Sequence, residues 1–434
     1  MKKAIFCLAA CFSSTVAFGA PVELTYWDFL GGGDGVRNKQ IVEEFNKSQT
    51  DIHVSESTLT WGEPFYTKVH TAVVAGQTPD VMTYHLSHFA AGILAKDLRP
   101  FTNEELSAAG LKASDFQKSL VDRSLEISKR YANSDQLFGV PLDTHTLVLY
   151  YNKTALQKAG LLGPDGKPTG MDGYEAFTAM LKTAKDKTHL IPVSENIYSE
   201  DPASLWRLWY TFFRQQGGDF LKDGKLSFDD VGNQGVKSLQ FIADWAKDGL
   251  IPKNTGYQSM VALFSAGRAV FMINGNWEVP TMVDLQKNSK LPFEYGVAAL
   301  PKFFGTHQIW ADSHQLAIPN NDKNPPTPEK VAAALKFIAF FVGQVTWAGG
   351  GHIPAYLPVQ ESDAYKQMVP NNEYSAQAAQ NVEYEPILPI FGVGGPTFAP
   401  ISNFLVPAVN GQLPVDQGIK GFVGELQKFS QQQQ

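Results

Sequence analysis

The chain has 434 residues, 44% of them hydrophobic and 12% aromatic, and its formal net charge at pH 7 is −7. An acidic chain of this kind is a poor partner for nucleic acid or for an anionic membrane surface. It is also too long for one hydrophobic core, so two or three domains are expected.

The first nineteen residues predict a signal peptide. Lys2 and Lys3 precede an apolar stretch that is too short to span a bilayer, and Ala17-Phe18-Gly19 places small residues where a signal peptidase cuts. We therefore expect a secreted protein that begins near Ala20. Leu8-Ala9-Ala10-Cys11 resembles a lipoprotein cleavage box, so lipid anchoring stays open as an alternative.

Both cysteines, Cys7 and Cys11, lie in this segment. A chain processed near Ala20 would carry no thiol, which excludes disulfides, thiolate metal sites and cysteine nucleophiles. No later run approaches the roughly 18 apolar residues of a membrane span, so the remainder is predicted to be soluble.

Strands alternate with helices in the first part of the chain. Strands are predicted over Val22–Phe29, Ile52–Leu59 and Asp80–Tyr84, and helices over Arg37–Ser48 and Tyr66–Ala75. A glycine loop, Gly31–Gly35, joins the first strand to the first helix. Such alternation is typical of a parallel α/β sheet.

The middle of the chain predicts two crossings between sheets. Phe138–Asn152 is a long extended stretch interrupted by Pro141, and proline is confined to strand edges and bends. A second extended stretch covers Tyr295–Ile318. We expect the chain to leave its first lobe near Asp143 and to return near Trp310. Helices are predicted between and after these crossings, over Tyr174–Lys185, Leu205–Gln215, Val236–Lys247 and Pro328–Val342.

Several motifs, in this order, resemble one protein family. AVVAGQTPDVMTY is followed by the YYNK of Tyr150–Lys153, by FSAGRAVFMINGNW ending at Trp277, and by YGVAALP with a later WADSHQLAI. The series is similar to the extracellular solute-binding proteins of carbohydrate ABC importers, the group that includes maltose-binding and glycerol-phosphate-binding proteins. The resemblance covers the whole chain after the signal peptide.

The resemblance implies an α/β, two-lobed periplasmic binding protein fold of type II. Each lobe would hold a mixed sheet flanked by helices, with the ligand cleft between the lobes. The expected bounds are 20–142 plus 309–345 for lobe 1 and 143–308 plus 346–434 for lobe 2. The implied protein is a periplasmic monomer without cofactor, which binds a small-molecule carbohydrate, closes about a hinge, and docks on ABC permease subunits of the inner membrane.

A sugar presents hydroxyls at its ring edge and C–H groups on its faces, so its site needs aromatic platforms bordered by polar side chains. In open α/β sheets such sites lie beyond the carboxyl ends of the strands. Aromatic, acidic, amide, histidine and glycine residues, most of them at such positions, form the candidate site: Trp27, Asp28, Gly33, Trp61, Tyr84, His85, Asp143, His145, Trp206, Asn276, Trp277, Trp310, Asp312, His314, Gly351 and His352.

Each candidate has a structural alternative. Tryptophan is often a core residue, and aspartate often caps a helix or a turn. Four of the histidines could suggest zinc, but none has an HxxxH or HExxH spacing, so no metal site is predicted. The glycine loop fits neither GxGxxG nor GxxxxGK[ST], which argues against a nucleotide and for close approach to a ligand.

The residue types favour a neutral ligand. A phosphorylated or sulfonated ligand would need several cations, and only Arg37, Arg207 and Arg268 are evident. The expected ligand is therefore a neutral di- or oligosaccharide or a glycoside, and an anionic glycerol phosphate or sulfosugar is the alternative. No GxSxG elbow or metalloprotease motif is present, so no catalysis is predicted, although carboxylate pairs leave a carbohydrate-cleaving enzyme as a third reading.

Overall fold

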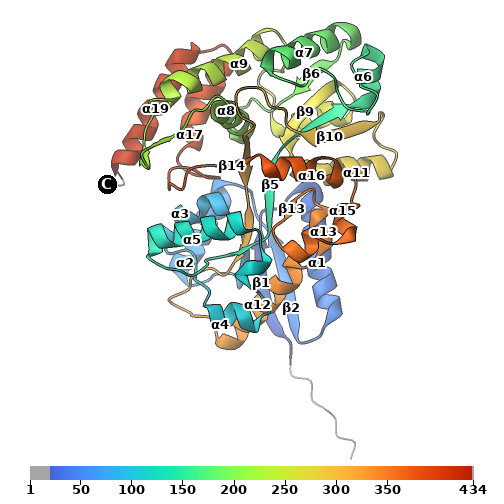
Figure 1. The fold of residues 1–434 in the computed structure, drawn as a ribbon. Coiled ribbons are helices and arrows are strands. Elements are labelled where there is room, and N and C mark those ends of the chain that lie inside the picture. Colours follow the sequence, from blue (N-terminus) through green and yellow to red (C-terminus); the bar gives the residue numbers. More distant parts are fainter. Residues whose placement is uncertain (1–19, 433–434) are drawn as a thin grey trace, which may run out of the picture.

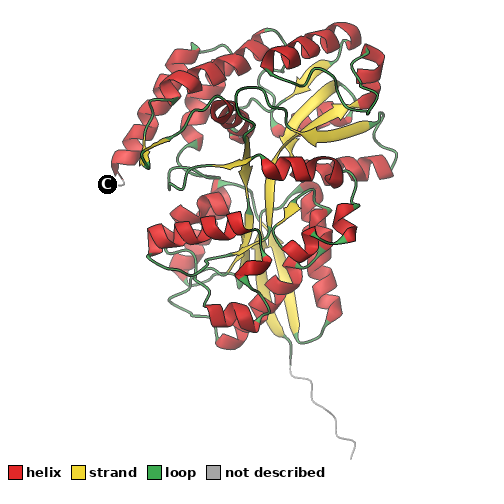
Figure 2. Ribbon diagram, viewed as in Figure 1, coloured by secondary structure: helices red, strands yellow, loops and turns green. Residues whose placement is uncertain are grey.

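The computed structural model describes residues 20–432, and the expected signal peptide, residues 1–19, lies outside them. Two lobes are stacked one above the other, with strand β5 (Asp143–Asn152) running between them (Figure 1). Each lobe is a sheet covered by helices (Figure 2). Within residues 20–432, no helix is long and apolar enough to cross a membrane. The α/β fold of two mixed sheets confirms the expected fold class.

Lobe 1 is built on a five-stranded sheet. In spatial order its strands are β2 (Ile52–Thr58), β1 (Val22–Asp28), β3 (Val81–His85), β12 (His314–Ala317) and β4 (Val140–Pro141). The first three are parallel, as the alternation of strands and helices predicts, whereas β12 runs antiparallel to its neighbours. The flanking helices include α1 (Gly32–Ser48), α2 (Glu63–Ala75), α5 (Lys118–Ala132) and α12 (Pro328–Val342).

The sheet of lobe 1 buries alternate residues of β1. Leu24 and Tyr26 face inward, and the Tyr26 ring meets Phe337 of α12 edge to face at 5.5 Å. Phe337 and Phe341 are four residues apart, so they share one face of that helix. The helix begins where the sequence predicts, because the Thr327 hydroxyl accepts a hydrogen bond from the Lys330 backbone N–H and Pro328 suits the first turn.

Lobe 2 is built on a seven-stranded sheet around β5. Its other strands are β6 (Ile191–Ser194), β9 (Ala269–Gly275), β10 (Tyr295–Ala299), β11 (Ile309–Asp312), β13 (Ile353–Pro354) and β14 (Val382–Tyr384). Its helices include α7 (Tyr174–Thr188), α8 (Ala203–Gln215), α9 (Val236–Lys247), α10 (Tyr257–Ser265), α11 (Val279–Lys287) and α19 (Val415–Gln432). Helix α8 is buried along almost its whole length, and most of its residues are apolar or aromatic.

Strand pairing locates the crossings between the lobes. Strand β11 pairs with β5 in the second sheet and β12 pairs with β3 in the first, so the chain returns to lobe 1 at Ser313 and not at residue 309. Beyond the expected boundary at 345, Trp347 and Ala355 still pack in the core of lobe 1, whereas Ile353 packs in lobe 2. Three segments therefore meet where the lobes join: the start of β5, the junction of β11 and β12, and the segment around β13.

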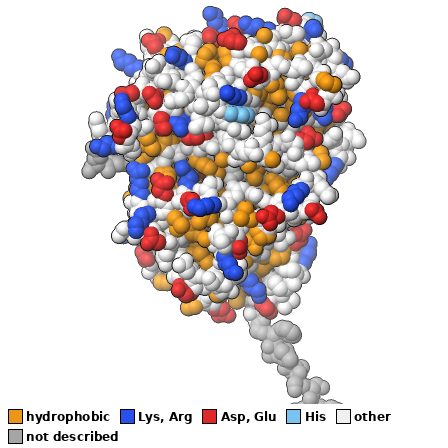
Figure 3. Space-filling model, in the orientation of Figure 1, with side chains coloured by type: hydrophobic (Ala, Val, Ile, Leu, Met, Phe, Trp, Pro, Cys, Tyr) orange, Lys and Arg blue, Asp and Glu red, His pale blue; other side chains and the backbone are white. Residues whose placement is uncertain are grey.

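The face of the molecule seen in Figure 3 carries acidic and basic side chains intermingled. No broad area of one charge sign stands out on that face, as the mixed charge of the sequence leads one to expect.

Candidate functional site

A cavity of about 690 Å³ lies between the lobes. Lobe 1 contributes the loop from β1 into α1, the loop after β2, the last residue of β3 and the first residue of β12. Lobe 2 contributes the start of α8, the start of α10, and the turn that joins β9 to α11. These segments lie at the ends of strands and helices. Backbone groups and short polar side chains therefore reach the cavity alongside aromatic rings.

Six of the sixteen candidate residues line this cavity: Gly33, Trp61, His85, His145, Trp277 and His314. The other ten, Trp27, Asp28, Tyr84, Asp143, Trp206, Asn276, Trp310, Asp312, Gly351 and His352, are not among the lining residues. All of these ten except Trp27 are buried, and several of them hold neighbouring backbone or side chains through hydrogen bonds.

Three of the aromatic candidates are packed inside their lobes. Tyr84 is fully buried against Tyr66 and Phe89 in lobe 1. Trp206 is buried in lobe 2, where its Nε1–H donates to Glu385. Trp27 lies partly buried on β1 beneath the ammonium of Lys68. These rings belong to the scaffold in this structure and are not cavity walls.

Two of the acidic candidates are backbone anchors. The Asp28 carboxylate accepts a hydrogen bond from the Leu30 backbone N–H, and burial raises its pKa to about 7. The Asp312 carboxylate accepts from the backbone N–H groups of Ser87 and Ser313 and from the Ser87 hydroxyl, and burial raises its pKa to about 6. Asp312 thus ties the end of β11 to the end of β3 across the join between the lobes.

Arg207 is the main cavity residue outside the candidate set. It follows Trp206 on α8, so it points about 100° away from that ring and into the cavity. Its guanidinium lies 4.6 Å from the ring centroid of Trp310, 4.7 Å from that of Trp277 and 5.6 Å from that of Trp61. Trp310 therefore supports the cavity from behind, through Arg207.

The guanidinium of Arg207 donates no hydrogen bond within residues 20–432, although the residue is only 7% exposed. Burial lowers its pKa from the usual arginine value, and the nearby carboxylate of Asp201 opposes that shift. A buried guanidinium has five N–H donors to satisfy, so its donors are free for a ligand. No local sequence pattern could have identified Arg207 as a cavity residue, because the rings around it, Trp61, Trp277 and Trp310, come from separate segments of the chain.

Hydrogen bonds fix the Trp277 ring. Its Nε1–H donates to the Tyr257 hydroxyl at 2.9 Å, and that hydroxyl donates to the Glu278 carboxylate at 2.6 Å. Tyr257 and Glu278 also line the cavity. Burial raises the pKa of Glu278. This series of hydrogen bonds fixes the Trp277 ring in place, and the indole N–H already has a partner.

The glycine loop is the first turn of α1, which begins at Gly32 and not at Arg37 as predicted. Gly33 lies against Pro280 of lobe 2: a Cβ atom there would be 2.7 Å from the Pro280 Cβ and 2.9 Å from the Thr281 backbone N. The absence of a side chain at Gly33 therefore allows lobe 2 to approach closely, whereas the sequence predicts that the loop approaches a ligand. Asp34, in the same turn, adds a carboxylate to the cavity lining.

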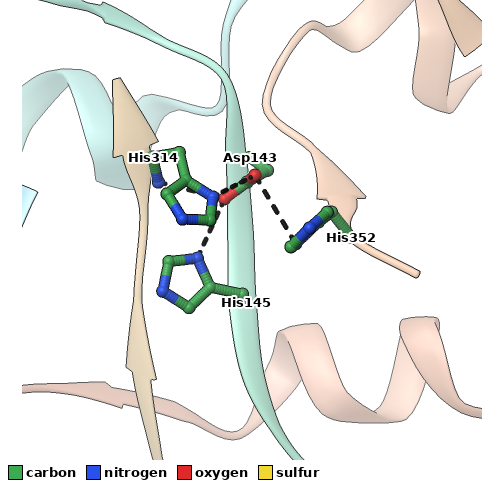
Figure 4. Close-up of side chains that lie close together, drawn as sticks. All are labelled: Asp143, His145, His314 and His352. Atoms are coloured by element: carbon green, nitrogen blue, oxygen red, sulfur yellow. Dashed lines mark hydrogen bonds and ion pairs between the residues drawn. The ribbon is translucent and has the colours of Figure 1, made fainter. Parts of the chain in front are cut away.

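A cluster of histidines surrounds Asp143 (Figure 4), and two of them, His145 and His314, also line the cavity. The Asp143 carboxylate lies 3.1 Å from the Nδ1 of His145 and 2.9 Å from the Nδ1 of His314. The Nδ1 of His352 is 3.6 Å away, and Trp347 donates its Nε1–H to the same carboxylate. The neighbouring histidines hold the pKa of Asp143 well below its usual value against the effect of burial.

Two further candidates fix the backbone near this cluster. The Asn276 side-chain oxygen accepts from the Thr146 backbone N–H, which fixes the turn before Trp277 to β5. Gly351 has φ of +88°, and a Cβ there would lie 1.9 Å from the Asn276 carbonyl oxygen. Only glycine fits that approach, so Gly351 is a packing residue beside the site.

Comparisons with known proteins agree with this architecture. The family described as bacterial extracellular solute-binding protein matches residues 40–373. The arabinooligosaccharide-binding protein of Bacillus subtilis is 24% identical over 81% of this chain and 77% of its own length. The sn-glycerol-3-phosphate-binding periplasmic protein UgpB of Pectobacterium atrosepticum is 24% identical over 69% of this chain and 65% of its own length.

A solved structure, the GacH receptor of Streptomyces glaucescens, superposes with a TM-score of 0.77 at 19% identity and covers 94% of this chain and 98% of its own. At that identity the likeness concerns the fold. Together with the family match, it confirms the resemblance that the motifs indicate.

Proposed function

Because the chain belongs to the bacterial extracellular solute-binding protein family, we propose that it is the periplasmic substrate-binding component of an ABC importer for a carbohydrate. Its cargo in this proposal is a neutral di- or oligosaccharide or a glycoside, which it delivers to the membrane permease without chemical change. The sugar-binding relative from Bacillus subtilis supports this class of ligand.

The composition of the cavity lining carries the proposal. Trp61, Trp277 and Tyr257 offer flat faces for the C–H side of sugar rings. Between them stand the carboxylates of Asp34 and Asp201, acceptors that suit paired hydroxyls, and the donors of Arg207. A volume of about 690 Å³ lies well inside the range of small-molecule sites and leaves room for more than one ring.

Charge favours a neutral ligand over an anion. The lining holds the carboxyl groups of Asp34, Asp201 and Glu278 and one guanidinium, that of Arg207. A phosphate or sulfate would face repulsion from the first two and would find a single permanent cation. The glycerol-phosphate-binding relative and the free donors of Arg207 nevertheless support an anionic ligand as the second candidate.

Binding by both lobes provides the mechanism. A ligand that contacts Trp61 of lobe 1 and Trp277 of lobe 2 stabilises the arrangement in which the lobes lie together. Contacts between the lobes outside the cavity add to this: Arg37 of α1 pairs with both carboxylate oxygens of Asp284 of α11, at 2.7 and 2.8 Å. The permease would then recognise the closed form.

A thermal-shift screen, followed by calorimetry, tests the proposal. The chain without residues 1–19 is mixed with neutral di- and oligosaccharides, glycosides, sn-glycerol 3-phosphate and sulfosugars, and a ligand that binds the folded state must raise the melting temperature. A shift from a neutral sugar, recovered unchanged afterwards, supports the first candidate. A shift from anions alone supports the second. Sugar cleavage would contradict a purely binding role.

A further inference from the structure

The histidine cluster at the join of the lobes has a geometry that sugar binding does not require. From it we propose a site for a divalent transition-metal ion of the Zn²⁺ class, formed by Asp143, His145, His314 and His352. One ligand atom from each of these four residues lies within 4.8 Å of the other three, and all four side chains are buried. This proposal is independent of which sugar, if any, the cavity binds.

The distances fit a small tetrahedral ion. Metal–ligand bonds of about 2.0 to 2.2 Å in a tetrahedron put neighbouring ligand atoms roughly 3.4 Å apart. The Nδ1 atoms of His314 and His352 are 2.9 and 3.6 Å from Oδ2 of Asp143, and the Nδ1 of His145 is 3.1 Å from the other oxygen, Oδ1. Movements on the order of 1 Å would complete the coordination sphere. Three imidazoles and one carboxylate are ligands that suit zinc, and also copper and nickel.

His352 supplies the second, independent observation. It is fully buried, stacked on Trp347 with ring centroids 4.6 Å apart, and neither ring nitrogen has a hydrogen-bond partner. A neutral imidazole carries an N–H that costs about 1–3 kcal/mol when it is buried unsatisfied. Coordination through Nδ1 removes that cost. The other nitrogen, Nε2, then faces the carboxylate of Asp34 at 3.8 Å, the arrangement in which a second carboxylate supports a metal-bound histidine.

A neighbouring trio, His85, His145 and Asp312, could also hold an ion. It shares His145 with the first cluster, so one ion excludes the other. The first cluster is favoured because both ring nitrogens of His352 lack a hydrogen-bond partner, whereas the Nδ1 of His85 already pairs with the Tyr66 hydroxyl. The spacing of the four ligands in the sequence conceals the site, since the three chain crossings bring them together.

An ion at this position would affect both the join between the lobes and the ligand cavity. Asp143 and His145 lie on β5, His314 begins β12 and His352 precedes β13, so the ion would tie together three segments at which the chain passes between lobes. His145 and His314 also line the ligand cavity. With Nδ1 on the metal, each of these imidazoles keeps its proton on Nε2, so the ion would set their hydrogen-bonding role toward a ligand.

Metal binding by the chelator-stripped protein without sugar tests the proposal. Zn²⁺ titration by calorimetry, with metal content by mass spectrometry, should give one ion per chain, and Co²⁺ should give the visible spectrum of a tetrahedral site. His352→Gln removes a ligand that does not line the cavity and should weaken Zn²⁺ binding at least about 100-fold, beyond the loss typical of an outer-shell change. His70→Gln, an exposed histidine paired with Asp97, is the matched control and should leave binding unchanged.

No Zn²⁺ uptake, uptake unaffected by His352→Gln, or an octahedral Co²⁺ spectrum would each overturn the proposal. Should the variant fail to fold, His85→Gln, which removes a ligand of the neighbouring trio alone, decides between the two clusters: unchanged Zn²⁺ binding supports the proposal, and lost binding overturns it. Loss of sugar binding with metal binding intact would contradict the proposed function and leave the metal site standing.

Discussion

Arg207 lies against the face of Trp277, with its guanidinium carbon 4.7 Å from the ring centroid. The arginine comes from α8, and the tryptophan follows β9, 70 positions later in the chain. Trp310 lies at a similar distance on another side of the guanidinium, and the guanidinium donates no hydrogen bond within residues 20–432. A cation held by aromatic faces keeps its N–H edge available, so the pair can act as one binding element.

Replacement of Arg207 should therefore damage ligand binding more than folding. Because hydrogen bonds to a charged group contribute about 1.5–3 kcal/mol, Arg207→Met should weaken the ligand found in the screen by roughly 10- to 100-fold. Arg207→Lys should also lose binding, since an ammonium lacks the flat, forked donors. Calorimetry measures both, with the exposed Arg130→Lys as control. Unchanged affinity in Arg207→Met would contradict a role in binding.

Replacement of Trp61 and replacement of Trp27 should have different effects on ligand affinity in the same assay. Both are predicted from the sequence to contact ligand, yet Trp61 lines the cavity and Trp27 does not. Loss of a large aromatic contact costs on the order of 2 kcal/mol, so Trp61→Ala should reduce affinity about 30-fold. Trp27→Ala should leave it unchanged in samples shown to be folded by circular dichroism. Equal losses in the two variants would mean that the ligand lies elsewhere in the cleft.

The bounds of helices can be predicted from the sequence, whereas the orientation of Trp61 and Trp27 cannot. Helices α9 and α12 begin and end at the predicted residues, because apolar periodicity and a threonine cap are local signals. Which tryptophan faces the cleft depends on the packing of segments far apart in the chain. Trp206 and Arg207 illustrate this on one helix. Their side chains point about 100° apart, one into the core and one into the cavity, and composition does not determine which of the two faces the cavity.

The lobe boundaries show the same limit. A proline in a strand marks the first crossing near Asp143, but no comparable signal stands at Ser313, where two short strands belong to different sheets. The histidines suggest zinc in the sequence, but no spacing supports a metal site there. Metal motifs are recognised by spacing along one helix or loop, and these four ligands come from three crossings.

Glu195 should make the stability of the unliganded protein depend on pH. It is buried, one carboxylate oxygen has no hydrogen-bond partner, and burial raises its pKa to about 8. The folded state therefore keeps a proton that the unfolded chain releases near its ordinary pKa of about 4.5. This contribution is fully present below that ordinary value and is lost as the pH rises through about 8.

Glu195→Gln keeps the neutral form at every pH. Its free energy of unfolding should match that of the unaltered chain near pH 5 and exceed it near pH 8.5, by an amount on the order of a few kcal/mol. Urea denaturation across this range measures the difference, and Glu200→Gln, at an exposed position, serves as control. A difference that stays constant with pH would show that Glu195 is not protonated in the folded state.

Gly33 should control how closely the lobes approach. A methyl group at this position would meet Pro280 at 2.7 Å and the Thr281 backbone at 2.9 Å, both in lobe 2. Overpacking of this size costs about 1–3 kcal/mol. The cost falls on the closed arrangement alone, because alanine suits the first turn of α1 better than glycine does. Gly33→Ala should therefore fold normally and bind ligand roughly tenfold or more weakly.

Gly31→Ala is the matched control, since nothing lies within 4 Å of a Cβ atom there and its φ of −106° suits alanine. Affinity is measured by calorimetry, and small-angle scattering with saturating ligand reports whether the lobes still close. If the contact between α1 and α11 limits closure, Gly33→Ala should keep a larger radius of gyration than Gly31→Ala. Equal affinity and equal compaction in the two variants would mean that the lobes close without pressing Gly33 against Pro280.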